Sequence, residues 1–220
     1  MTTEKEIFNK QTAPFILIDC ENQILHWHPG NLTQAESSKS LLTQFKISTS
    51  ASGLGELEGS HKTPRGWHEI AEKFGEGCAL GSVFAAREPT GAVYNTELQA
   101  KFPERKDWIL SRILRLKGSE QGFNAGISQT SPNKESCDTY CRYIYLHGTN
   151  REDLIGIPAS IGCVRMRNPD IINLFDKVPI GCPVLVLENL SKECLDAALY
   201  RKPKNILGHH LSSFSNYKKN

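Results

Sequence analysis

The sequence lacks any long hydrophobic run and any large excess of one charge. None of its 220 residues belongs to an apolar stretch of the roughly 18 residues that a membrane-spanning helix needs. The 26 Lys and Arg residues are scattered among 24 Asp and Glu residues, which leaves a net charge of +2. A nucleic-acid-binding surface usually shows a concentrated basic stripe. We therefore expect no membrane span and no nucleic-acid partner.

The first residues also lack the pattern of a secretory signal peptide. Acidic residues lie among the first lysines, and the apolar run 15–18 is too short for the hydrophobic part of a signal. The sequence as it stands predicts a cytoplasmic protein. A start further upstream would make a periplasmic or cell-envelope location the alternative.

The cysteines lack the spacing of a disulfide-bonded scaffold. There are seven, an odd number, so reduced thiols are the consistent interpretation. Cys137 and Cys141, together with His147 and either Cys163 or Cys182, could be imagined as zinc ligands. Their spacing is not that of a known zinc finger, and we expect neither a metal nor a cofactor.

The composition is that of an ordinary globular protein, with 39% hydrophobic and 23% charged residues. Its length fits one domain with short tails. Alternating apolar residues and turn formers predict a mainly β (α+β) domain. The expected strands are a hairpin over 15–28 with its turn at 21–23, then 45–52, 67–71, 108–116, 141–148 and 182–188, with a loop or short helix over 29–44.

The clearest strand and the clearest helix lie close together in the sequence. In the predicted helix, Asn168 is the N-cap, Pro169 takes the first helical position and Pro179 ends the helix. Alternation in the strand CRYIYLHG places Arg142, Ile144 and Leu146 on one face and Tyr143, Tyr145 and His147 on the other.

A thiol and an imidazole flank a loop between these two elements. His147 ends the strand, and Cys163 follows Gly162 sixteen positions later. An imidazole can take the proton of a thiol, and the resulting ion pair lowers the pKa of the thiol. Glycine allows a turn whose amides can point at an oxyanion. A buried cysteine and a hydrogen-bonded structural histidine are the alternative, which spacing alone favours.

Two neighbours of the thiol extend this hypothesis. Ser160 offers a hydroxyl, and Arg165 offers a fixed cation that could bind a carboxylate.

The run RYIYLHGT, followed by GIPASIGCVRMRNPDIINLFDKVPIGCPV, resembles the catalytic core of the L,D-transpeptidase (YkuD-type) family. Upstream, FILIDCENQILHWH is similar to the opening hairpin of that family, and ISTSASGLGELEGSHKTPRGWHEI to its glycine loop and T-P-x-G turn. The resemblance covers residues 14–188. It implies a β-sandwich or barrel with a helix after the cysteine turn, in a domain over 14–190 between tails at 1–13 and 191–220.

The resemblance also implies roles for individual residues. Cys163 would be the acyl-accepting thiol and His147 its base. The amides of Gly162 and Cys163 would form the oxyanion hole. Arg165 would hold the site or the substrate, and Ser160 and Gly148 would shape the site. Ile161 departs from the family, in which many members have a second histidine there, and a carbon side chain cannot hydrogen-bond.

The implied chemistry is acyl transfer on murein stem peptides. The thiol attacks the carbonyl that joins the third stem residue to a terminal D-alanine and releases D-alanine, and water or an amine then resolves the thioester. We expect an L,D-carboxypeptidase that trims recycled tetrapeptides. The alternatives are an L,D-transpeptidase that forms crosslinks and a non-catalytic module that binds zinc or murein peptides.

Other polar residues are weaker candidates. A surface role is expected for His26, Trp27 and His28, and the His209-His210 pair should be solvated. Loops often carry specificity, so substrate contacts are possible at a few further positions. These positions are His61, His68, Arg65 and Arg87, with Tyr143 and Tyr145 lining a groove or packing.

Overall fold

The computed structural model describes residues 13–30, 43–191 and 193. Eight strands close into a barrel in the order β4-β10-β1-β2-β3-β9-β8-β7, and β7 pairs back with β4. The predicted mainly β fold is confirmed, in its barrel form. The barrel strands are β1 (Phe15–Asp19), β2 (Ile24–His28), β3 (Thr43–Ser48), β4 (Gly66–Phe74), β7 (Ile109–Gly118), β8 (Tyr145–Thr149), β9 (Val164–Met166) and β10 (Pro183–Leu187). Most of the predicted loop over 29–44 and of both tails, including His209-His210, lies outside the described residues.

The β1–β2 hairpin forms where the sequence predicts it. The Asp19 carboxylate accepts hydrogen bonds from the backbone and side-chain amides of Asn22, at 3.1 and 2.8 Å. An aspartate that bonds the backbone a few residues later stabilises a turn in this way. On its other side β1 pairs in parallel with β10, and every residue of these two strands is buried. Strands that are buried on both faces are continuous apolar runs in the sequence, as FILI of β1 and PVLVL of β10 are.

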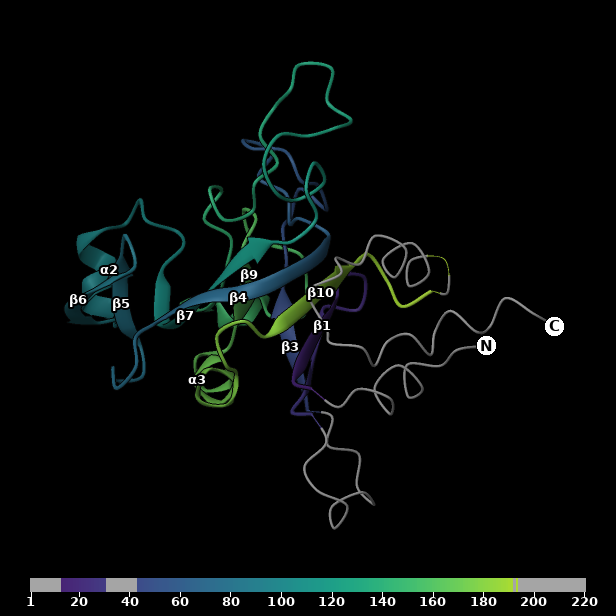
Figure 1. The fold of residues 1–220 in the computed structure, drawn as a ribbon. Coiled ribbons are helices and arrows are strands. Elements are labelled where there is room, and N and C mark those ends of the chain that lie inside the picture. Colours follow the sequence, from purple (N-terminus) through teal and green to yellow (C-terminus); the bar gives the residue numbers. More distant parts are fainter. Residues whose placement is uncertain (1–12, 31–42, 192, 194–220) are drawn as a thin grey trace, which may run out of the picture.

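The barrel and one helix share a hydrophobic core. The helix α3 (Asn168–Lys177) buries Ile171, Leu174 and Phe175 in the core that the strands line, and Figure 1 shows it beside the strands. The predicted N-cap is wrong by one residue, because Arg167 is the cap and Asn168 is already helical. The Asn168 side chain is used elsewhere, since its Nδ2 donates to the carbonyl of Thr149 at 2.8 Å.

A hairpin and a short helix, not predicted from the sequence, extend from the barrel between β4 and β7. They are β5 (Ser82–Ala85), β6 (Glu88–Val93) and α2 (Thr96–Lys101), which gather at one end of β7 in Figure 1. Val83, Trp108 and Leu110 form a small separate core for this extension. The many turn formers in this stretch hid its short elements from a search for periodicity.

The strand predicted at 141–148 begins later, at Tyr145, and runs to Thr149. Before it the chain turns, because the Asp138 carboxylate accepts from the Cys141 amide at 2.9 Å. Tyr143 has a φ of 55° and is 52% exposed. Local side-chain capping has therefore overridden the alternating pattern, and Tyr143 does not share a strand face with His147.

The expected surface position of His26, Trp27 and His28 is wrong. All three are buried in β2, which lies between β1 and β3 in the barrel. Burial lowers the pKa of His28, whose Nδ1 accepts a hydrogen bond from the Gly30 amide at 3.1 Å. Alternation in the sequence could not show that both faces of this strand are covered.

His68 is also buried, which argues against the substrate contact considered for this position. Its two ring nitrogens lie 2.9 Å from the Gly66 carbonyl and 3.1 Å from the Thr139 hydroxyl. Burial lowers the pKa of His68 to about 4. In the unfolded chain a histidine keeps a pKa near 6.5.

We expect His68 to make the protein less stable in acid. Between pH 6.5 and about 4 the unfolded state binds a proton that the folded state does not. The free energy of unfolding should fall by about 1.4 kcal/mol per pH unit, roughly 3 kcal/mol in total. The free energy of unfolding of His68→Gln, measured with urea across this pH range, should change less steeply with pH than that of the wild type, by an amount that corresponds to about one proton. An unchanged slope would contradict the buried, neutral imidazole.

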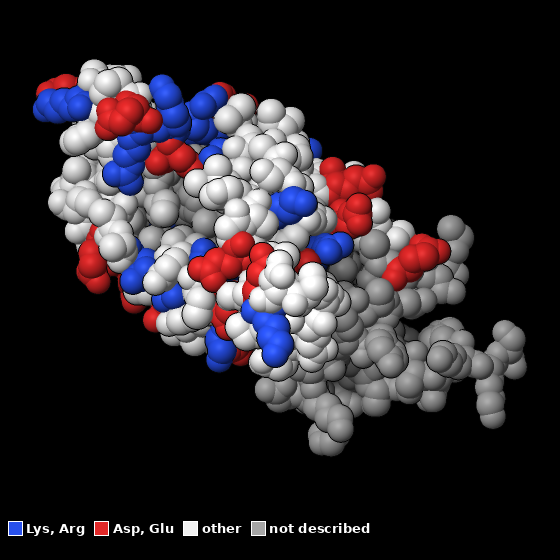
Figure 2. Space-filling view, turned by 90° about the horizontal axis from the view of Figure 1, so that it is seen from above, with Lys and Arg blue, Asp and Glu red and all other residues white. Residues whose placement is uncertain are grey.

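Basic and acidic side chains intermingle on the face shown in Figure 2, without a continuous basic stripe among the described residues there. No helix in the described ranges is long and apolar enough to cross a membrane.

Candidate active site

Two neighbouring strands bring His147 and Cys163 to one face of the barrel wall. β8 and β9 are parallel, with His147 opposite Arg165 and Leu146 opposite Val164. Cys163 immediately precedes β9. Because side chains alternate along a strand, Cys163, Arg165, Tyr145 and His147 point to the same side. The Cys163 thiol lies 3.6 Å from the carbonyl oxygen of Tyr143.

The imidazole of His147 is buried and held in one tautomer. Its Nδ1 lies 2.8 Å from the Gly148 carbonyl oxygen, which can only accept, so Nδ1 carries the proton. The other nitrogen, Nε2, is therefore the basic one. Burial lowers the pKa of His147, with Arg165 lowering it further and Asp107 opposing. The ring is neutral near pH 7 and can accept a proton.

Glycine is the only residue type that fits at position 148 without a rearrangement of its neighbours. A Cβ there would stand 2.4 Å from Asn168 Oδ1 and 2.6 Å from the Leu110 carbonyl oxygen. A side chain at position 148 therefore has no room beside the carbonyl that His147 contacts.

The thiol of Cys163 is protonated at neutral pH. Desolvation raises its pKa to about 11, although a hydrogen bond from the Tyr145 backbone and the charges of Arg165 and Arg142 favour the thiolate. The sequence-based expectation of a lowered pKa is therefore wrong, because burial outweighs the nearby cations. His147 must take the proton as the thiol attacks.

The turn before the thiol is fixed from both sides. Gly162 has a φ of +131°, a conformation that side chains rarely allow. Its carbonyl accepts from the Thr63 hydroxyl at 2.9 Å. Ser160 Oγ donates to the Cys163 carbonyl and accepts from the Gly162 amide at 3.2 Å. An oxyanion must therefore displace Ser160 from the Gly162 amide or use the amide of Cys163.

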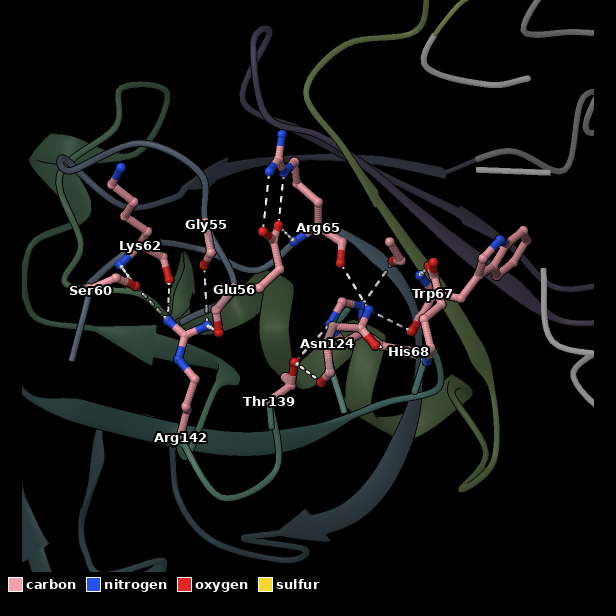
Figure 3. Close-up of polar contacts among 12 residues, drawn as sticks. Gly55, Glu56, Ser60, Lys62, Arg65, Trp67, His68, Asn124, Thr139 and Arg142 are labelled. Atoms are coloured by element: carbon pink, nitrogen blue, oxygen red, sulfur yellow. Dashed lines mark hydrogen bonds and ion pairs between the residues drawn. The ribbon is translucent and has the colours of Figure 1, made fainter. Parts of the chain in front are cut away.

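The loop over residues 55–63 packs behind this turn and is held by Arg142. The sequence interpretation did not assign Arg142 to the site. Its guanidinium points at the loop in Figure 3 and donates to the carbonyl oxygens of Glu56 and Lys62, at 2.7 and 2.6 Å. The same loop carries Thr63, which bonds Gly162. Arg142 thus supports the turn and also favours the thiolate of Cys163.

Arg165 is buried rather than open to solvent. It is 4% exposed, and its Nε and Nη2 donate to one carboxylate oxygen of Asp107, at 3.1 and 2.6 Å. Its Nη1 donates to the Ala159 carbonyl at 3.0 Å. Of the two roles that the sequence suggests for Arg165, holding the site fits these contacts better than binding substrate.

Asp107 was missed by the sequence interpretation, because it lies far from the motif and looks like an ordinary charged residue. It precedes β7 and acts electrostatically on both His147 and Cys163. Its carboxylate therefore offsets the charge of Arg165 beside the base.

We expect Asp107→Asn to lower both stability and the pKa of His147. The change leaves the buried Arg165 cation without its counter-charge, and breaking a buried pair costs several kcal/mol. Because the Asp107 side chain is 26% exposed, we expect a loss of about 2 kcal/mol. Urea unfolding and NMR titration of the imidazole would measure the two effects.

Asp153→Asn is the matched control for Asp107→Asn, since it removes the carboxylate of an exposed ion pair with Arg151. It should leave stability and the imidazole titration unchanged. An Asp107→Asn variant that behaves like this control would remove Asp107 from the site.

The remaining candidates are dispersed. Arg65 forms an ion pair with Glu56 at 2.8 Å, whereas Arg87 contacts Tyr145 beside the thiol. Ile161, at the position where the family often has histidine, is 69% exposed. His61 is exposed in its turn.

The proposed zinc ligands do not form a cluster. The Cys137 thiol is buried against the Gly126 carbonyl at 3.4 Å, while Cys141 is exposed. Within the described ranges, no three His, Cys, Asp or Glu side chains are grouped to hold a metal ion.

Comparison with known proteins gives short, strong sequence matches and a looser structural likeness. A putative L,D-transpeptidase YqjB of Bacillus subtilis is 43% identical over 44 residues, and a probable L,D-transpeptidase ErfK/SrfK of Escherichia coli is 47% identical over 47 residues. These stretches cover 20% and 21% of this chain and only 25% and 15% of the relatives. L,D-transpeptidase 3 from Mycobacterium tuberculosis, solved with a faropenem-derived adduct, aligns at a TM-score of 0.41 and 13% identity, over 79% of this chain and 60% of that one.

A family model covers far more of the chain than these pairwise matches. The model of the L,D-transpeptidase catalytic domain matches residues 14–186, which include β1, both residues of the His147 and Cys163 pair, and most of β10. This chain therefore belongs to the L,D-transpeptidase catalytic domain (YkuD) family.

Proposed function

We propose that the protein catalyses acyl transfer on murein stem tetrapeptides through a thioester at Cys163. The observation that carries this proposal is the neutral His147, which has its basic Nε2 left available on the same face as the thiol. The thiol attacks the carbonyl between the third stem residue and the terminal D-alanine. His147 takes the thiol proton and then gives it to the leaving amine.

The turn at Gly162 would stabilise the tetrahedral intermediate. The developing oxyanion is bonded by the Cys163 amide, and by the Gly162 amide if Ser160 releases it. Because Thr63 and Ser160 hold this turn in place, the Cys163 amide is positioned before the attack begins. Collapse of the intermediate releases D-alanine and leaves the tripeptide on the sulfur.

In the finer form of the proposal, water resolves the thioester. His147 can activate a water as it activated the thiol, and this acceptor needs no second binding site for another stem. The protein is then an L,D-carboxypeptidase that trims tetrapeptides returned to the cytoplasm during murein recycling.

Crosslinking is the second candidate. The relatives with matching stretches are named L,D-transpeptidases, which favours an amine from another stem as the acceptor. Both candidates share the same thioester and differ only in how it is resolved.

Incubation of the protein with a disaccharide tetrapeptide, followed by mass spectrometry, tests the proposal. Tripeptide and free D-alanine without a dimer would support hydrolysis. A crosslinked dimer without tripeptide would favour the second candidate. If no thioester and no product form, acyl transfer is wrong and a module that only binds murein peptides takes its place.

A further inference from the structure

A tight hairpin turn carries an arginine toward the nucleophile. Ala85 pairs with Glu88 across the β5–β6 hairpin, so the turn consists of Ala86 and Arg87 alone. Their φ values are 49° and 74°. Two-residue hairpin turns with both residues at positive φ normally use asparagine and glycine. Alanine and arginine adopt this conformation only at a cost in backbone energy. The tight turn therefore fixes the position of Arg87 despite the strain.

Arg87 contacts the two tyrosines that flank the thiol. Its Nη1 lies 3.3 Å from the Tyr145 hydroxyl, and its guanidinium carbon stands 5.2 Å from the centre of the Tyr143 ring. Tyr145 belongs to the apolar cluster against which Cys163 packs, and the Tyr143 carbonyl lies 3.6 Å from the thiol. The hairpin tip therefore reaches the immediate surroundings of the nucleophile.

A second arginine beside these rings is bound within the protein. Arg115 donates to Glu72 at 2.8 Å and to the Tyr140 carbonyl at 2.9 Å, and its side chain is 7% exposed. Its guanidinium carbon also lies 5.0 Å from the Tyr143 ring centre. Arg115 is thus a structural support for the exposed ring of Tyr143.

Arg87 has bonding capacity left over. Among the residues that the structure describes, no acceptor contacts its Nε or Nη2, and the Glu72 carboxylate is already paired with Arg115. Two guanidinium groups and one carboxylate leave an excess positive charge at Tyr143. A planar guanidinium with two free donors matches a carboxylate, which it can bind in a bidentate fashion.

We propose that Arg87, seated on Tyr143 and Tyr145, binds the C-terminal carboxylate of the donor stem peptide. This inference rests on the proposed function, because it assigns the end of that substrate. In a peptide the terminal carboxylate lies only roughly 4 Å from the preceding carbonyl carbon. Since the Tyr143 backbone carbonyl lies beside the thiol, a carboxylate bound by Arg87 would bring that carbonyl carbon toward Cys163.

The consequence is specificity for the last peptide bond. A chain with one more residue would bring an uncharged amide to Arg87, and a peptide bond further from the end would lie out of register with the thiol. Losing a hydrogen-bonded ion pair at a binding site corresponds to a factor of about 10 to 100 in kcat/KM.

The inference is tested by removing the charge of Arg87 and the charge of the substrate carboxylate, separately and together. Release of the terminal residue is measured for a tetrapeptide acid, for its C-terminal amide, and for a peptide amidated on the side-chain carboxylate of the third residue. The wild type should prefer the acid over the C-terminal amide by about 10- to 100-fold in kcat/KM. Arg87→Gln should lose about that factor with the acid and stay within about twofold with the C-terminal amide. Arg87→Lys should keep part of the preference.

Arg151→Gln is the matched control, because it removes an exposed arginine paired with Asp153. It should leave all three rates unchanged. Equal losses of Arg87→Gln with acid and amide would overturn the inference. If the wild type discriminates only against the peptide amidated at its third residue, and Arg87→Gln loses that discrimination, Arg87 binds that side-chain carboxylate and the terminal assignment is overturned. If the wild type forms no thioester with any peptide, it is the proposed function that fails.

Discussion

Cys163→Ala is expected to abolish thioester formation, with kcat/KM reduced at least about 10⁴-fold, because no other group at the turn can form the covalent bond. Ser160, the nearest hydroxyl in sequence, already bonds the carbonyl of Cys163 and the amide of Gly162. The measurement is the mass of the intact protein after mixing with a tetrapeptide or with a carbapenem, a β-lactam that acylates thiols. The wild type should gain one acyl adduct and the variant none.

Cys141→Ala provides the matched control for this experiment. Cys141 is the exposed cysteine among the described residues, so it is the thiol from which non-specific labelling would arise. Its replacement should leave the adduct and the rate unchanged. Equal labelling of Cys163→Ala and the wild type would remove Cys163 from the mechanism.

The pair of His147 and Cys163 could be predicted from the sequence because its determinants are local. A strand ending in His-Gly and a turn of the form Ser-x-Gly-Cys lie within one short segment, and the family pattern fixes their order. Parallel pairing of β8 with β9 then brings the two side chains to one face. The roles of Gly148 and Gly162 follow from the same segment, since close contact or backbone conformation there requires glycine.

The supporting roles of Asp107, Arg142 and Thr63 could not be predicted from the sequence. Arg142 and Thr63 stand within stretches that resemble the family, whereas Asp107 lies far from them. In all three cases the sequence does not show which groups the side chain meets. Their roles depend on which carbonyl or carboxylate they meet, and this is a property of the fold rather than of any motif.

Burial explains the wrong predictions about the buried histidines and the thiol pKa. Alternation along a strand tells which side chains share a face, but not whether both faces are covered, so a surface role was expected for the β2 histidines and a substrate contact was considered for His68. The thiol pKa was misjudged for the same reason. The predicted ion pair with the imidazole suggested a lowered value, whereas desolvation of the sulfur is the larger effect.

His147→Gln is expected to lower kcat/KM for the tetrapeptide by about 10³-fold at neutral pH, in the range typical of a lost general base. With a pKa of about 11, roughly one Cys163 thiol in ten thousand is ionised at pH 7. The reaction therefore depends on a base that removes the proton during attack. Glutamine can still hydrogen-bond to the Gly148 carbonyl through its amide, but it cannot accept the proton.

Alkylation of Cys163 by iodoacetamide across a pH range separates this chemical role from a structural one. In the wild type the rate should rise with pH until it levels off near the thiol pKa of about 11. At that pH the solvent supplies the base, so His147→Gln should alkylate within about threefold of the wild type while remaining slow with peptide at pH 7. A variant that alkylates equally poorly at high pH would show that His147 holds the turn in place and does not carry the proton. Because the imidazole is buried and neutral, its replacement removes no charge beside the sulfur, and the midpoint of the alkylation profile should not move.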